Sequence, residues 1–175
     1  MSTRWLEPDM ARRFAEVGFG PVEMGGRPVH PMLRLPARAG DVVSVEWRSA
    51  ASPRVQGLAA RVRAPGVPGA KGRAGTLRVG TAESPSISLW MDTAPNPSTF
   101  AIVKARAGAE LQISNRWRMP DGREDEWFQN YGMLIEDLSD DRYVLRCSDG
   151  AHPAGPDFDD LVVIVSRMSR DVNRR

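Results

Sequence analysis

The chain has 175 residues, of which 41% are apolar and 26% are charged. That balance is typical of a soluble globular domain with a single core, and it excludes an intrinsically disordered chain. No apolar run approaches the roughly 18 residues of a membrane helix, and the first residues lack the apolar segment of a secretory signal, so we expect a cytoplasmic protein. The single cysteine, Cys147, excludes an internal disulfide bond.

The net charge of +2 is unevenly distributed along the chain. Residues 1–120 hold 17 Lys and Arg against 9 Asp and Glu, whereas residues 121–175 hold 7 against 13. The sequence therefore predicts an acidic, cation-attracting region on a mildly basic body.

Near the N-terminus, the pattern predicts a loose arm over residues 1–8, followed by one short helix. Asp9 is a suitable cap for a helix over Met10–Val17, in which Met10, Phe14 and Val17 share one face. The Pro- and Gly-rich stretch from residue 21 to about residue 36 predicts a loop.

From Gly40 onward the apolar period becomes two, which is typical of half-buried strands. Arg106–Ala109 is expected to join two strands as a hairpin, and the acidic segment Glu136–Asp141 to join two others. The predicted strands are Val43–Trp47, Leu58–Ala64, Leu77–Val79, Ile87–Met91, Phe100–Ala105, Glu110–Ser114, Tyr131–Ile135, Arg142–Cys147 and Leu161–Val165.

Many short strands and one helix predict an all-β fold, a single-domain antiparallel β-sandwich of jelly-roll type with a short N-terminal helix. We expect three segments: an arm with the helix and loop over residues 1–36, the sandwich over 37–168, and a basic tail over 169–175.

The acidic run Asp157-Phe158-Asp159-Asp160 opens the last predicted strand. In extended backbone, Asp157 and Asp159 project to one side, and Phe158 and Asp160 to the other. Clustered carboxylates favour a hard cation, so Asp157, Asp159 and Asp160, with Asp149 from the preceding turn, are candidate calcium ligands. The alternative is that these aspartates cap turns or pair with arginines.

The Asp149-Gly150 pair followed by residues 157–160 and an apolar strand resembles the calcium loops of bacterial β-sandwich modules, such as the calcium-dependent fucose-binding lectins. In those lectins the metal ions coordinate sugar hydroxyls directly. The resemblance covers about twelve residues. This chain inserts residues 151–155 and lacks the acidic residues that hold a second ion, so the resemblance implies one calcium ion at most.

A second candidate site, between Asn115 and Tyr131, combines aromatic rings with amides and a carboxylate, the side chains that recognise sugars or aromatic ligands. The alternative is that its aromatic residues plug the edge of the sandwich core, while Asn130 serves a turn or bulge. The candidate ligand-binding residues are Asn115, Trp117, Glu124, Trp127, Asn130 and Tyr131.

Catalytic and nucleic-acid patterns are weak. Cys147 continues the alternation of Tyr143 and Leu145, so we expect a buried thiol rather than a nucleophile. No nucleic-acid partner is expected, because the basic stripe lacks interleaved aromatic residues and is better explained as a solvated face. The stripe comprises Arg61, Arg63, Lys71, Arg73 and Arg78.

The sequence thus favours a non-catalytic binding module for a carbohydrate or another polar small molecule, assisted by calcium. Two alternatives stay open. One is a structural subunit that docks through the helical arm or forms homo-oligomers. The other is a jelly-roll isomerase or cyclase in which Glu124, Asp125 or Asp157 acts as a general acid.

Overall fold

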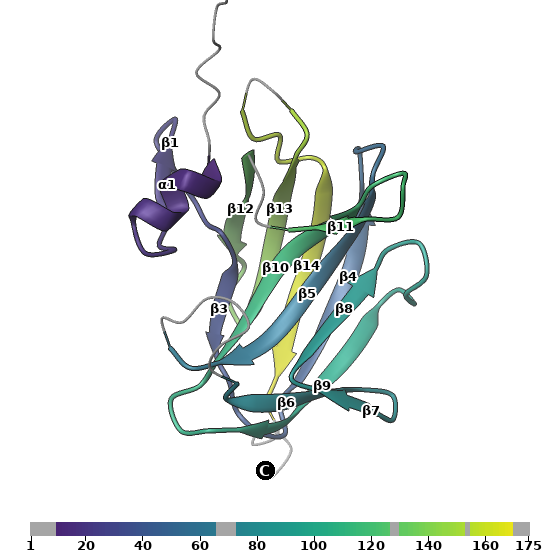
Figure 1. The fold of residues 1–175 in the computed structure, drawn as a ribbon. Coiled ribbons are helices and arrows are strands. Elements are labelled where there is room, and N and C mark those ends of the chain that lie inside the picture. The colour runs from purple at the N-terminus through teal and green to yellow at the C-terminus, as the bar shows by residue number, and fades with distance from the viewer. Residues whose placement is uncertain (1–9, 66–72, 127–129, 153–154, 170–175) are drawn as a thin grey trace, which may run out of the picture.

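A computed structural model describes residues 10–65, 73–126, 130–152 and 155–169. Strands account for 58% of the residues that the structure describes, which confirms the all-β prediction. Two antiparallel sheets face each other, and a short helix and a hairpin lie at one end (Figure 1). The jelly-roll connectivity stays a prediction.

The larger sheet has the strand order β12-β13-β14-β4-β9-β6-β7. Its strands are β4 (Val42–Ser49), β6 (Gly75–Val79), β7 (Ala82–Ser84), β9 (Ser98–Ala105), β12 (Asn130–Asp137), β13 (Arg142–Gly150) and β14 (Leu161–Met168).

The smaller sheet has the order β11-β10-β5-β8, and β3 pairs with the first part of β10. Its strands are β3 (Leu33–Pro36), β5 (Val55–Arg63), β8 (Ser86–Trp90), β10 (Glu110–Arg118) and β11 (Glu124–Asp125).

The main core lies between the two sheets because alternate residues of each strand face inward. In β4 the inward residues Val43, Val45 and Trp47 are buried, as their spacing predicts. Leu58 of β5 and Leu111 of β10 contribute from the opposite sheet.

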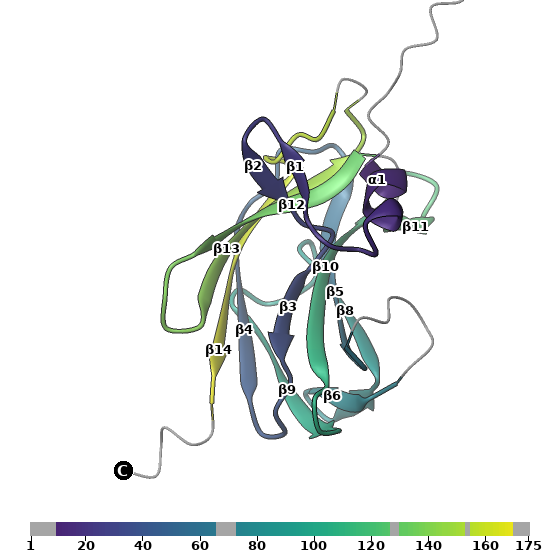
Figure 2. The same ribbon diagram turned by 90° about the vertical axis from the view of Figure 1, so that its left-hand side faces the viewer.

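A second, smaller core lies at one end of the sandwich, where helix α1 (Met10–Glu16) and the hairpin β1 (Val22–Met24) and β2 (Arg27–Val29) lie beside β12 (Figure 2). Met10 and Phe14 are fully buried there, and the rings of Phe14 and Tyr131 lie 5.0 Å apart. Gly132 permits this packing: a Cβ at that position would lie 2.8 Å from the Val29 side chain.

Three local predictions are wrong. Val17 lies beyond the helix and is about half exposed, so it does not share the buried face. The expected loop over residues 21–36 contains β1, β2 and β3. Strands β9 and β10 do not form a hairpin, because β9 joins the larger sheet and β10 the smaller one. The proposed cap Asp9 and the tail from residue 170 lie outside the described residues.

Within the described ranges, no helix is long and apolar enough to cross a membrane.

Candidate functional site

The acidic run makes a turn at residues 158–159 rather than lying extended, and its residues differ in burial. Asp157 and Asp159 are exposed, Phe158 is half-buried against the second core, and Asp160 is buried. The run therefore presents two carboxylates to solvent and directs one into the protein.

Asp149 lies at the end of β13 with no exposed surface. One carboxylate oxygen, Oδ2, accepts hydrogen bonds from the Ser52 hydroxyl and from Gln56 Nε2, the latter at 3.0 Å. The other, Oδ1, accepts from the backbone N–H of Ala151 at 2.9 Å. Arg54 adds a hydrogen bond to the Asp149 carbonyl oxygen at 3.1 Å. Asp149 therefore joins β13 to the segment between β4 and β5.

Asp160 is the buried neighbour of Asp149, and its Oδ2 accepts the backbone N–H of Asp149 at 2.9 Å. Burial, aided by the nearby negative charges of Asp149 and Asp157, raises the pKa of Asp160 to about 7. The two carboxyl groups thus form a coupled pair that does not readily hold two negative charges.

These contacts do not assemble the predicted calcium ligands around one point. Asp157 Oδ1 accepts the backbone N–H of Asp159 at 3.2 Å, and Asp159 lies 3.7 Å from Arg146. Among the residues that the structure describes, no three His, Cys, Asp or Glu side chains are grouped to hold a metal ion. The contacts favour the alternative of turn caps and arginine partners, and calcium binding stays a prediction.

Half of the residues of the predicted aromatic site are internal. Asn115, Trp117 and Tyr131 have no exposed surface, so they offer no face to a ligand from solution. Asn115 Nδ2 instead donates to the Ser148 carbonyl oxygen at 2.8 Å. These placements favour the alternative that the aromatic residues fill the core.

The remaining members of that predicted site are Glu124, Trp127 and Asn130. Glu124 is exposed and lies 3.3 Å from Arg116. Trp127 lies outside the described residues, and Asn130 is described for its backbone alone, as the first residue of β12.

A groove that the sequence did not predict lies beside the acidic run. It has a volume of about 490 Å³ and brings the exposed Asp157 and Asp159 together with residues from distant parts of the chain. Its lining residues are Arg27, Leu134, Arg146, His152, Pro156, Asp157, Phe158 and Asp159.

A smaller hollow of about 240 Å³ continues this groove along β12 and β13, because it shares Arg27, Leu134 and Arg146 with it. Glu136 and Val144 lie at its far part. Strand pairing and the packing of the β1–β2 hairpin bring these residues together, so no local motif could have marked them.

Cys147 has no exposed surface, as its alternation predicts. Burial, aided by the nearby charge of Asp160, raises the pKa of the Cys147 thiol far above its usual range. His152 is exposed on the groove, so the buried thiol and this imidazole do not form a reactive pair at the surface.

No protein-family model, curated protein or solved structure matches this chain.

Proposed function

We propose that this protein is a non-catalytic binding module whose groove beside the acidic run holds a carbohydrate or a similar polyhydroxylated small molecule. The supporting observation is the groove itself, in which cationic, anionic and apolar side chains converge from the β1–β2 hairpin, β12, β13 and the segment before β14.

The chemistry of the lining suits hydroxyl groups. The carboxylates of Asp157 and Asp159 accept hydrogen bonds from hydroxyls, while the guanidinium groups of Arg27 and Arg146 donate to hydroxyl and ring oxygens. Phe158 gives an apolar surface against which the C–H face of a sugar packs. The loose contact between Arg146 and Asp159, at 3.7 Å, leaves both side chains able to turn toward a ligand.

The enzyme alternative requires a carboxyl group with a raised pKa in a pocket that admits substrate. Asp160 has the raised pKa, but it does not line the groove; Asp157 and Asp159, which do, are exposed to water. The residues therefore favour binding over general acid catalysis.

A glycan array probed with and without calcium tests this function, followed by calorimetric titration of any hit. We expect Arg146→Gln to weaken binding about tenfold, the value of one charge-assisted hydrogen bond. Arg142→Gln is the matched control, because Arg142 lies exposed on the same strand and does not line the groove.

An array without hits, or equal losses from the Arg146 and Arg142 substitutions, would contradict the proposal. Light scattering that then showed a stable oligomer would favour the assembly-subunit alternative.

A further inference from the structure

Arg63, the last residue of β5, is a buried cation whose donors are not all used. The residue is 4% exposed, and its Nε and Nη1 have no hydrogen-bond partner. Burial, together with the charges of Arg61 and Arg73, lowers the pKa of Arg63. A guanidinium group nevertheless stays protonated in proteins, so the unfavourable burial of this charge is not relieved by losing a proton.

Two carboxylates that could pair with a cation on β5 are engaged elsewhere. Glu126 pairs with Arg61 on the same strand. Glu110 is directly opposite Arg63 in the register of β5 and β10, but it accepts a hydrogen bond from Gln112 at 2.6 Å and lies 3.7 Å from Arg34. The described residues therefore give Arg63 no anionic partner.

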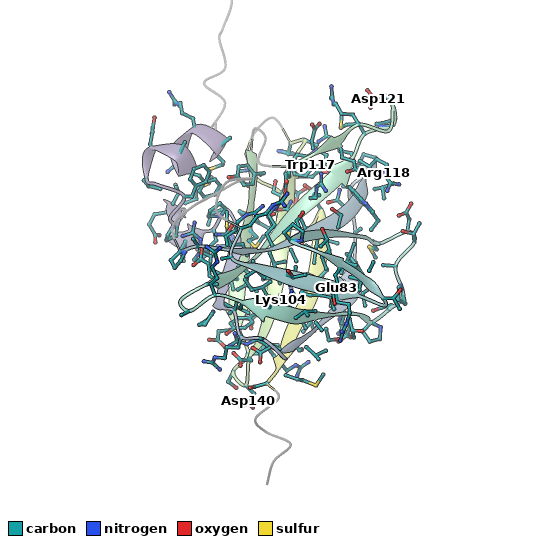
Figure 3. The ribbon with its side chains drawn as sticks, turned by 60° about the horizontal axis from the view of Figure 1, so that its bottom comes forward. Glu83, Lys104, Trp117, Arg118, Asp121 and Asp140 are labelled. Carbon is teal, nitrogen blue, oxygen red and sulfur yellow. The ribbon has the colours of Figure 1, made fainter. Side chains whose placement is uncertain are left out.

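A cationic cleft of about 400 Å³ adjoins this position. Arg73, Lys104 and Arg106 line it, and none of its described lining residues is a carboxylate. The backbone of Arg73 forms a β-bridge with that of Arg63, so the buried arginine lies opposite a residue that lines the cleft. Figure 3, with the lower end of the molecule turned forward, shows Lys104 well away from Trp117 and Arg118, which lie toward the other end.

The backbone around the cleft is closely packed. A Cβ at Gly75 would lie 2.2 Å from the Lys104 carbonyl oxygen and 2.7 Å from the Val62 side chain, so the start of β6 fits tightly against both β9 and β5. The Arg106 N–H donates to the Ala74 carbonyl oxygen at 2.7 Å, which fixes the end of β9 on the same segment. The three cations consequently project from a well-defined scaffold.

We infer that the cleft formed by Arg73, Lys104 and Arg106, with Arg63 behind it, binds a tetrahedral oxyanion of the phosphate or sulfate type. The three side chains supply charge-assisted donors, and Thr76, also in the lining, supplies a hydroxyl. A doubly charged oxyanion also offsets the unpaired positive charge of Arg63. This site is separate from the groove beside the acidic run and does not depend on the proposed function.

Thermal melts test the site with sodium phosphate, sodium sulfate and sodium chloride at matched ionic strength. A ligand that binds only the folded protein raises the melting temperature in a saturable way. We expect saturable rises of a few degrees with phosphate or sulfate beyond chloride, and calorimetric titration then gives Kd. If the melting temperature rises with only one of the two anions, that anion is the one that the site prefers. Equal melting temperatures in all three salts would overturn the inference.

The variant Lys104→Gln should weaken phosphate or sulfate binding about tenfold, because one charge-assisted donor is lost. Arg78→Gln is the matched control: Arg78 is exposed on β6 but does not line the cleft. Equal binding by the Lys104 and Arg78 variants would contradict the assignment, since the anion would then respond only to overall charge.

The variant Arg63→Met tests whether Arg63 contributes to anion binding or only to the stability of the fold. Methionine fills similar space without a charge, so the variant should melt at a higher temperature in chloride and lose most of its response to phosphate or sulfate. A lower melting temperature in chloride with an undiminished response would show that Arg63 is satisfied within the fold. Binding to DNA with a steep salt dependence, but no saturable response to inorganic anions, would replace the inference with a nucleic-acid surface.

Discussion

Replacing Asp160 with asparagine should remove a pH-dependent loss of stability. In the folded protein the Asp160 Oδ2 accepts the Asp149 N–H at 2.9 Å, and an asparagine oxygen at that place keeps this hydrogen bond. What the substitution removes is the negative charge that burial and Asp149 disfavour. Asp160→Asn should therefore be close to wild type at low pH and more stable at high pH.

The size of the effect follows from the two pKa values of Asp160. An aspartate in an unfolded chain has a pKa of about 3.9, whereas folding raises that of Asp160 to about 7. The folded state therefore binds this proton more tightly than the unfolded state does. Protonated Asp160 stabilises the fold at low pH, and this stabilisation is lost as pH rises through about 7. The shift corresponds to about 4 kcal/mol in total, of which about 2 to 3 kcal/mol falls between pH 5 and pH 8.

Urea unfolding of the wild type and the variant at several pH values between 5 and 8 measures this difference directly. Contributions from titrating groups that do not interact with Asp160 cancel in the comparison. Asp159→Asn is the control, since it removes the same charge from an exposed position of the same run and Asp159 is not among the groups that raise the pKa of Asp160. Parallel pH curves for the wild type and Asp160→Asn would refute the assignment of a buried carboxyl group with a raised pKa.

Three further predictions concern the two cores and the acidic run. Gly132→Ala should destabilise the fold by about 1 to 3 kcal/mol in urea unfolding, because φ is +144° there and the added methyl meets the packed hairpin; an unchanged midpoint would refute the close packing. The Cys147 thiol should resist iodoacetamide in the native protein and react after unfolding, as mass spectrometry can measure, and rapid native labelling would contradict its burial. Since the contacts of Asp149 and Asp160 are made within the protein, we expect calcium to raise the melting temperature no more than magnesium does; a calcium-specific rise of several degrees would restore the predicted metal site.

Local periodicity was enough to predict the strands whose alternate residues face the core. The alternation of Val43, Val45 and Trp47 marked β4 correctly. Such patterns report which side of a strand is buried. They do not report which sheet the strand joins, and for this reason β9 and β10 were mistaken for a hairpin.

The strands hidden in the Pro- and Gly-rich segment show a second limit. Gly25 and Gly26 both adopt positive φ and make the turn between β1 and β2, so residues that suggested a loop instead connect two strands. The hairpin then brings Arg27 beside Arg146 of β13 in the groove. That contact depends on tertiary packing, which no pattern within either segment contains.

The two ends of the sandwich differ in how they accommodate buried charge, and this difference supports the anion site that we propose. Removing a carboxylate or a guanidinium group from water is unfavourable unless hydrogen bonds or an opposite charge compensate. Asp149 receives donors from Ser52, Gln56 and the backbone of Ala151, so its charge is stabilised within the fold. Arg63 has two donor atoms without a partner and lies beside further cations. The buried charge of Asp149 is therefore compensated within the fold, whereas that of Arg63 would be compensated by the anion that we propose.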